Sequence, residues 1–480
     1  MGTGRRFNYL VISDLHLQEA DRDPAGRIFY FDQEFADFLR HYRLFYVDER
    51  KWKLIIAGDL IEFYRIPVRP SVDEKLLRSV TLTSTDRKFF PGTEPEKSVW
   101  KLELILRSHP QLLLALARFV AEGNEIHIVR GNHDLEFFWP EVQERFRLLI
   151  AQHHPVDVGY LDMKAAVQGG IVFEPWFFLE NELLYVEHGH QYDEYCSNAH
   201  PLYPLLPHQA KRIELALSAL TMRYFVARLK SVDPAAMENI NSIPRYLLRL
   251  IVSNPGQALL MPVYYVEMLA RTLGKVLRSD PVSETEIEAK EEQTRKAVAG
   301  AYGLEVSTLR TLEGLARRPV LASRWETIKC LSLDLVAAAL LGFGGIAWLA
   351  SSALVTGRAW AWGVSILFVA LLGLVGRRRM SRVNNHGNLR EIARTIQRAL
   401  GVRHVVFGHS HDPDAMPLPI AKGWYFNIGT WVPRGKEGLF TYLELRDSEG
   451  AAAYLMRWDR RLERPVPMET LPSAAARVHP

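Results

Sequence analysis

The chain has 480 residues, of which 48% are hydrophobic and 24% charged, so it can bury a sizeable core in roughly two to three domains. Its formal net charge of +4 argues against a nucleic-acid binder that relies on a broad basic surface. The two cysteines, Cys196 and Cys330, have no metal-type spacing, and their scarcity fits a reducing compartment. The first apolar run begins too early for a signal peptide, so we expect none.

Short apolar runs alternate with helical stretches through about residue 195, which predicts a layered α/β arrangement. Five such runs have the length and composition of strands: 9–13, 54–57, 126–130, 183–187 and 404–407. Helices are expected over 30–46 and 98–122, a loop-and-helix excursion over 65–98, and two strands within 160–187.

Metal-ligating side chains follow each of the five runs. In chain order they are Asp14 and His16, then Asp59, then Asn132-His133-Asp134, then His188 and His190, and last His409 and His411. Strand ends of this kind meet at one edge of an open α/β sheet, where ligands bind. Carboxylate, amide and imidazole donors together suit borderline divalent metals, and seven of them suffice for two ions that share a carboxylate.

A long insertion separates the fourth motif from the fifth. Residues 201–330 are predicted to be mainly helical, with a helix-rich stretch over 205–276 and a charged, solvated helix over 280–300. Aromatic and basic residues alternate in parts of 205–276, as in helices that lie on a membrane surface. A helical cap that packs its apolar faces internally is an equally good interpretation.

Residues 331–376 are the most apolar part of the chain, with only Asp334 and Arg358 charged. Two transmembrane spans fit, near 331–355 and 359–376, although a helical pair buried in a soluble core is the alternative. Basic residues flank both outer ends, which predicts that these ends face the cytoplasm. We therefore expect a multi-pass protein of the cytoplasmic (inner) membrane with its catalytic part inside.

The ordered motifs D-x-H, GD, GNHD, HG and G-H-x-H resemble those of the calcineurin-like metallophosphoesterase superfamily, over about residues 6–200 and 385–460. The segment 427–430 also resembles that family's closing strand. The resemblance implies an α/β fold, a four-layer α/β/β/α sandwich, here with a helical insertion and a two-helix transmembrane hairpin. The expected divisions are 1–200 and 377–480 for the two catalytic parts, 201–330 for the insertion and 331–376 for the hairpin.

The same resemblance implies the roles of the motif residues. It assigns Asp14, His16 and His411 to one ion, Asn132, His188 and His409 to the other, and Asp59 to both. His133 would face the substrate as a catalytic residue, with Asp134 holding its imidazole. His190 is an alternative ligand or a phosphate contact, Arg130 a tentative phosphate contact, and Asp193 and Asp412 are weaker supporting candidates.

These expectations describe a hydrolase of phosphate esters with two divalent ions, Mn²⁺ in the first place, with Fe, Zn, Ni or Mg as alternatives. The membrane segment favours a lipid-linked phosphate, pyrophosphate or phosphodiester, with membrane lipids as partners and no nucleic acid. Segments 13–17 and 58–63 are similar to UDP-2,3-diacylglucosamine hydrolases, which differ by an Arg at the position of His133. A soluble nucleotide is the alternative substrate, and an inactive membrane scaffold the alternative of another class.

Overall fold

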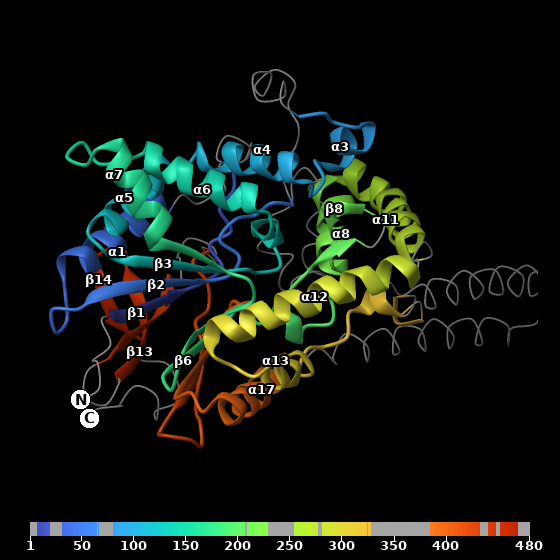
Figure 1. The fold of residues 1–480 in the computed structure, drawn as a ribbon. Helices are drawn as coiled ribbons and strands as arrows, with labels where there is room; N and C mark the ends of the chain where they lie inside the picture. Colours follow the sequence, from blue (N-terminus) through green and yellow to red (C-terminus); the bar gives the residue numbers. More distant parts are fainter. Residues whose placement is uncertain are drawn as a thin grey trace, which may run out of the picture.

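The computed structural model describes residues 7–19, 31–64, 66, 80–206, 209–228, 254–276, 281–323, 325–327, 385–432, 440–447 and 452–468. The predicted hairpin 331–376 and its basic flank lie outside these residues. The described part is a mixed α/β fold built on two large sheets (Figure 1).

The larger sheet has seven strands in the order β14-β13-β12-β1-β2-β3-β4. Strands β1 to β4 run parallel, and β12 to β14 extend the sheet in antiparallel fashion. The bounds are β1 (Phe7–Ile12), β2 (Lys51–Ala57), β3 (Glu125–Val129), β4 (Ile171–Glu174), β12 (Thr441–Arg446), β13 (Ala452–Asp459) and β14 (Arg464–Pro467). The parallel strands are mostly apolar runs because both of their faces are covered.

The smaller sheet has five strands in the order β10-β11-β9-β6-β5. Its centre is a parallel pair, β6 with β9, although about 200 residues of chain separate the two strands. The bounds are β5 (Phe177–Glu180), β6 (Leu184–Glu187), β9 (His404–Phe407), β10 (Asp414–Pro417) and β11 (Trp424–Asn427). The chain beyond the insertion is therefore needed to complete both sheets.

The two sheets pack face to face, with helices on both outer sides. Alternate residues of β1 show this, because Tyr9 and Val11 join the apolar cluster between the sheets, whereas Leu10 and Ile12 join the cluster beneath the helices. Val406 of β9 lies in the inner cluster and Val405 in the outer one on the other side. The layers follow the order helix, sheet, sheet, helix, which is consistent with the sandwich that the family resemblance implies.

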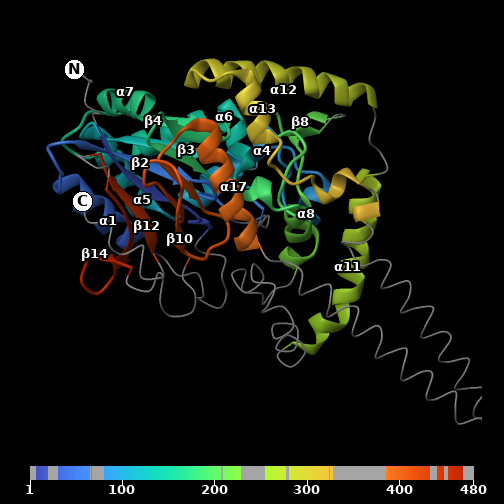
Figure 2. The ribbon, with the colours of Figure 1, turned by 90° about the horizontal axis from the view of Figure 1, so that it is seen from below.

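One helical layer covers the seven-stranded sheet, and another covers the five-stranded sheet (Figures 1 and 2). The first contains α1 (Asp32–Leu44), α4 (Pro95–Leu106), α5 (Pro110–Ala121), α6 (Pro140–Gln152) and α7 (Tyr160–Gly170). The second contains α12 (Pro281–Tyr302), α13 (Val306–Glu313) and α17 (Asn385–Leu400). Helix α17 ends at Leu400, and the following residue, Gly401, has a φ of +67°, a conformation that glycine adopts most readily after a helix.

Among the residues that the structure describes, no single helix has the length and apolar composition to cross a membrane. Helices α4 and α5 meet the criterion only together, with a bend of 99° between them, which is weak evidence for a membrane anchor.

Three expectations about secondary structure need correction. Residues 160–187 hold helix α7 and three strands, β4 to β6, because Met163 and Val167 are buried at helical spacing before Gly169 and Gly170 end the helix. The expected helix 98–122 is two helices, with a break before Pro110.

The stretch 205–276 opens with a small hairpin rather than a helix, formed by β7 (Leu205–Leu206) and β8 (Gln209–Ile213). Pro204 and Pro207 disfavour helix there because proline lacks the amide hydrogen. Helices α8 (Leu217–Tyr224) and α11 (Pro255–Val276) follow, as expected, and residues 229–253 of this stretch lie outside the described residues. The short helix α3 (Ser84–Phe89) lies in the predicted excursion 65–98.

Candidate metal centre

Five strands from the two sheets end at one place, and the predicted ligands lie on the loops that follow them. The seven-stranded sheet supplies Asp14 and His16 after β1, Asp59 after β2 and Asn132 after β3. The five-stranded sheet supplies His188 after β6, and His409 and His411 after β9. Six of these side chains are buried and His409 is partly buried, so the polar groups face one another rather than bulk solvent.

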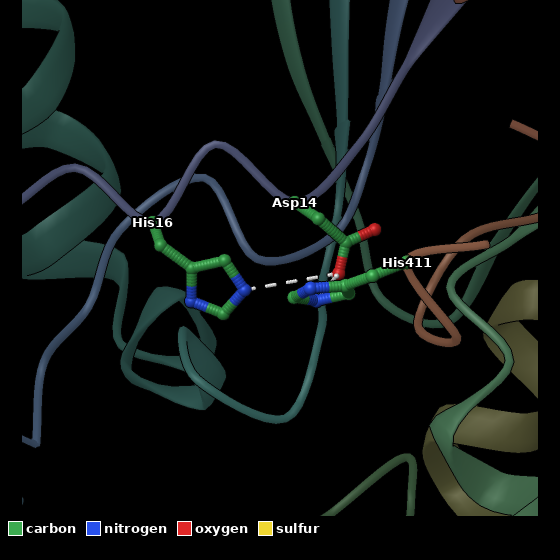
Figure 3. Close-up of side chains that lie close together, drawn as sticks. All are labelled: Asp14, His16 and His411. Atoms are coloured by element: carbon green, nitrogen blue, oxygen red, sulfur yellow. Dashed lines mark ion pairs between the residues drawn. The ribbon is translucent and has the colours of Figure 1, made fainter. Parts of the chain in front are cut away.

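Asp14 lies at the centre of the first group of ligands. Its Oδ1 is 2.9 Å from His411 Nε2 and 3.8 Å from His16 Nε2. Figure 3 shows the carboxylate facing both imidazoles, one from each sheet. Ligand atoms of Asp14, His16 and His411 all lie within 4.8 Å of one another, so the group could hold one ion.

Asp59 lies between this group and the second one. Its Oδ2 is 3.2 Å from His188 Nε2 and 3.6 Å from His16 Nε2. The amide oxygen of Asn132 is 3.1 Å from the same His188 nitrogen. A carboxylate that faces imidazoles of both groups has the position that a bridging ligand requires.

The ligand loops adopt an unusual backbone conformation. Asp14, His16, Asp59, His409 and His411 all have positive φ, between 46° and 66°. Left-handed conformations of non-glycine residues cost on the order of 1–3 kcal/mol each and gather at functional sites. Five such residues in one buried cluster indicate that this part of the molecule is built for binding rather than for stability alone.

Hydrogen bonds between the loops hold these ligands in place. His188 Nδ1 donates to the Ala57 carbonyl at 2.8 Å, which leaves Nε2 to face Asp59 and Asn132. This arrangement fixes the tautomer, as in many metal-binding histidines. The Asp14 carbonyl accepts hydrogen bonds from Thr430 Oγ1 at 2.9 Å and from Trp431 N at 3.2 Å, so the chain after β11 braces the first loop.

Buried carboxylates and imidazoles shift each other's ionisation. Burial opposes the ionised form of Asp14, but His411 and His188 outweigh it and hold the pKa of Asp14 far below its usual value. Burial also opposes the charged form of His188, but Asp59 and Asp14 raise the pKa of His188 to about 9. These opposite shifts show strong mutual attraction, and a cation would compete with protons for the same carboxylates.

His133 lies on the same loop as Asn132, and its partner was not foreseen from the sequence. His133 Nδ1 is 2.7 Å from Glu62 Oε2, and the Glu62 side chain is only 2% exposed. Burial lowers the pKa of His133, yet Glu62 and Asp59 raise it above the ordinary value. Glu62 follows Asp59 by three residues in the same strand-end loop, and this spacing was the available signal.

Asp134 does not hold the His133 imidazole, contrary to the sequence-based expectation. Its two carboxylate oxygens accept hydrogen bonds from Gly131 N at 2.6 Å and Leu60 N at 2.7 Å. These bonds tie the loop after β3 to the loop after β2. Burial, with Asp59 nearby, raises the pKa of Asp134 to about 7. Both carboxylate oxygens of Asp134 are thus occupied by backbone amides, and the His133 imidazole contacts the carboxylate of Glu62 instead.

The remaining sequence candidates have distinct surroundings. Arg130 is buried and donates through Nε to the Pro175 carbonyl at 2.8 Å and through Nη2 to the Pro201 carbonyl at 3.2 Å. These hydrogen bonds give its guanidinium a structural role in linking two segments of the backbone. His190 Nε2 is 2.9 Å from Gln191 Nε2, and burial together with His188 lowers the pKa of His190 far below its ordinary value. His190 is thus a neutral imidazole beside the ligand cluster.

Two acidic candidates differ in their relation to the ligands. Asp193 Oδ2 is 3.3 Å from His409 Nε2, a direct contact with a predicted ligand. Asp412 lies next to His411 in sequence, but its backbone amide interacts with Ser410 Oγ at 3.4 Å.

Residues 7–219 match the calcineurin-like phosphoesterase family. These residues therefore form a calcineurin-like metallophosphoesterase domain, and the chain is a metallophosphoesterase-family enzyme. The match ends at residue 219, within the insertion, so His409 and His411 lie outside the matched residues and reach the site through strand β9 of the smaller sheet. No curated protein matches the chain, and its similarity to UDP-2,3-diacylglucosamine hydrolases has no further support.

The residues present fit a dinuclear centre of the kind this family uses. Two buried groups, Asp14 with His16 and His411, and Asp14 with Asp59 and His188, each bring their ligand atoms within 4.8 Å. His16, Asp59 and His133 form a third such group, so geometry alone leaves His133 within reach of a metal. The donor set of carboxylates, imidazoles and an amide is the mixture that borderline divalent cations prefer.

Proposed function

We propose that the enzyme hydrolyses phosphate esters with two divalent ions held between its two sheets. Asp14, His16 and His411 would hold one ion, Asn132, His188 and His409 the other, and Asp59 both. The observation that carries this proposal is that side chains from five strand ends meet: Asp14, His16, Asp59, His188 and His411 form overlapping buried groups. The Asn132 amide oxygen contacts His188, and the His409 ring lies beside the His188 ring, with centroids 5.2 Å apart. Two such ions supply positive charge for the phosphoryl oxygens and lower the pKa of the attacking water.

His133 would act on the substrate rather than on the metals. Its Nδ1 faces Glu62, so Nε2 is the nitrogen left to approach the substrate. Glu62 favours the protonated imidazole, and a protonated Nε2 donates a hydrogen bond to a phosphoryl oxygen or a proton to the leaving group. Glu62 is thus a positioning residue for His133, and Asp134 supports the loops that carry Asp59 and Asn132.

His190 and Arg130 would shape the substrate side in different ways. His190 is neutral and buried beside His188, with ring centroids 5.4 Å apart, so it would offer a hydrogen bond to a substrate oxygen. Arg130 already donates to two carbonyls and would contribute positive potential rather than a direct contact.

For the substrate we propose a lipid-linked phosphate, pyrophosphate or phosphodiester, taken from the cytoplasmic face of a membrane. The apolar segment 331–376 and its basic flank support this setting. Helix α11 adds a second observation, since Leu260, Val263 and Val266 on it are 45%, 59% and 62% exposed. Soluble helices place polar residues on their exposed face, whereas a helix beside lipid does not need them.

Metal analysis of the purified chain, combined with hydrolysis assays, tests the reaction class. We expect close to two transition-metal ions per chain, with Mn²⁺ as the best activator, and hydrolysis of an aryl phosphate ester that stops on chelation. Hydrolysis that persists without metals, or a chain that binds none, would contradict the proposal. Assays with a fractionated lipid extract and with soluble nucleotides then separate the two substrate classes.

Cysteine labelling in intact cells tests the membrane setting. A cysteine placed by Gly357→Cys should react with a membrane-impermeant reagent, whereas one placed by Gly435→Cys should react only after the cells are opened. The proposal of a lipid substrate loses its main support if the chain stays in the soluble fraction without detergent.

A further inference from the structure

The turn after β6 carries a carboxylate that faces a predicted ligand of the other central strand. Asp193 Oδ2 is 3.3 Å from His409 Nε2. The Asp193 side chain is 18% exposed and that of His409 14%, so the contact is largely shielded from solvent. The contact connects strand ends that are more than 200 residues apart in sequence.

The rest of His409 is also held. Its backbone amide donates to Asp14 Oδ2 at 3.1 Å, and its φ of 66° keeps the residue in the left-handed conformation. With Nε2 turned to Asp193, Nδ1 is the ring nitrogen that remains for a metal. The His188 ring lies on the same side, with centroids 5.2 Å apart.

Asp193 is itself positioned by its own turn and by the insertion. Its Oδ1 accepts a hydrogen bond from Tyr195 N at 3.0 Å, and Cys196 Sγ lies within 4.8 Å of the carboxylate. The insertion binds this turn through three backbone hydrogen bonds. These run from Arg317 N to Gln191 O at 2.8 Å, from Val320 N to Glu194 O at 3.0 Å, and from Ser218 N to Tyr195 O at 3.0 Å.

We infer that Asp193 is a positioning residue that selects Nδ1 of His409 as the metal-binding nitrogen, and that the insertion holds Asp193 in place. A carboxylate behind a metal-binding imidazole fixes the tautomer and ring orientation and makes the imidazole a better ligand. The inference rests on the proposed function in one respect, namely that His409 binds a metal. It gives the helical insertion a role at the site besides any contact with substrate.

The experiment measures the affinity of both ions by chelator competition in wild type, Asp193→Asn and Asp193→Ala. We expect Asp193→Ala to weaken one ion by about 10–100-fold and to leave the other unchanged. Asp193→Asn keeps a hydrogen-bond acceptor and should have a smaller effect. In cobalt-substituted protein, the absorption bands of only one ion should shift.

Glu194→Gln is the matched control, because Glu194 is exposed in the same turn and its replacement removes one charge without touching His409. Equal affinities in wild type and Asp193→Ala, within about twofold, would overturn the inference. If Asp193→Ala does not fold, Asp193→Asn decides the question. Unchanged metal affinity together with an unchanged cobalt spectrum in Asp193→Asn would then overturn the inference.

Asp193, Cys196 and His409 also bring ligand atoms within 4.8 Å, so a separate ion bound by these three is the rival interpretation. Loss of an ion in Cys196→Ala would support the rival and overturn the inference. Wild-type chain that binds no metal would refute the proposed function, whereas two ions in wild type and unchanged affinities in the variants would refute only the role of Asp193.

Discussion

The two sheets contribute different chemistry to the site. The loops of the seven-stranded sheet carry the proposed oxygen ligands, Asp14, Asp59 and Asn132, with a single imidazole, His16. Those of the five-stranded sheet carry three imidazoles, His188, His409 and His411. Carboxylates gathered on one sheet would repel one another, but here each faces histidines of the other sheet. Neither sheet therefore forms the candidate metal centre alone, because the centre lies where the ligand-bearing edges of the two sheets meet.

The two edges also differ in how their loops are supported. On the seven-stranded side, neighbouring loops bind one another directly, for example through His16 N to Asp59 O at 2.9 Å and His133 N to Asp59 Oδ1 at 2.8 Å. On the five-stranded side, support also comes from the other sheet, since His188 Nδ1 donates to the Ala57 carbonyl and the His409 amide donates to Asp14 Oδ2. Substitutions on the two sides should therefore have different consequences.

The largest effect is expected for Asp59→Asn, which removes the carboxylate that faces imidazoles of both edges. Both ions should bind more weakly, and hydrolysis should fall to background, because the amide carries no charge to offset two cations. Elemental analysis and steady-state assays measure this, with Asp157→Asn, an exposed carboxylate, as control. Two ions at full occupancy in Asp59→Asn would show that this carboxylate does not bridge.

His133→Ala should lower the rate by about 10²–10⁴ while both ions remain, because general acid assistance is typically worth that much. The loss should shrink for nitrophenyl esters, whose leaving group needs less protonation. His154→Ala, which changes a histidine outside the metal cluster, serves as control. An ion lost together with the activity would identify His133 as a ligand, in line with its closeness to His16 and Asp59.

Glu62→Gln should reduce the rate by about 10–100-fold, less than His133→Ala, because the imidazole stays but loses the carboxylate that orients it. Without Glu62 the pKa of His133 should fall, since the carboxylate raises it. His133 would then lose its proton at a lower pH, so the alkaline limb of the pH–rate profile should move to lower pH. A profile that only drops, with its shape unchanged, would argue against this role.

A smaller effect is expected for His127, which joins the sheets away from the site. Its Nδ1 is 2.7 Å from Glu174 and its ring packs on Phe178 of β5, with centroids 4.9 Å apart. Burial opposes its charged form, but Glu125 and Glu174 raise the pKa of His127. The stabilisation is therefore complete below the unfolded pKa of about 6.5 and is lost as the pH rises through the raised folded pKa.

Urea unfolding at several pH values measures this contribution. His127→Gln should lose about 1 kcal/mol relative to wild type at pH 6 and progressively less as the pH rises. The replacement His154→Gln should show no such trend. An equal difference between wild type and His127→Gln at all pH values would assign the contribution to packing alone.

The sequence by itself was enough for the strands before each motif and the types of side chain at their ends, whereas the order of the layers came from the resemblance to a known family. These features are local, because apolar runs specify buried strands and the motif residues follow directly.

Only the tertiary structure decided which side chains meet. The contacts Glu62 to His133 and Asp193 to His409 depend on the distance and direction between loops, which no spacing rule encodes. Asp134 shows the same limit, because its carboxylate accepts hydrogen bonds from the backbone amides of Gly131 and Leu60. The loop that carries Leu60 is brought beside Asp134 only by the fold. Likewise, the left-handed backbone of the five predicted ligands depends on the packed loops, because even aspartate and histidine, which tolerate this conformation better than most residues, seldom adopt it.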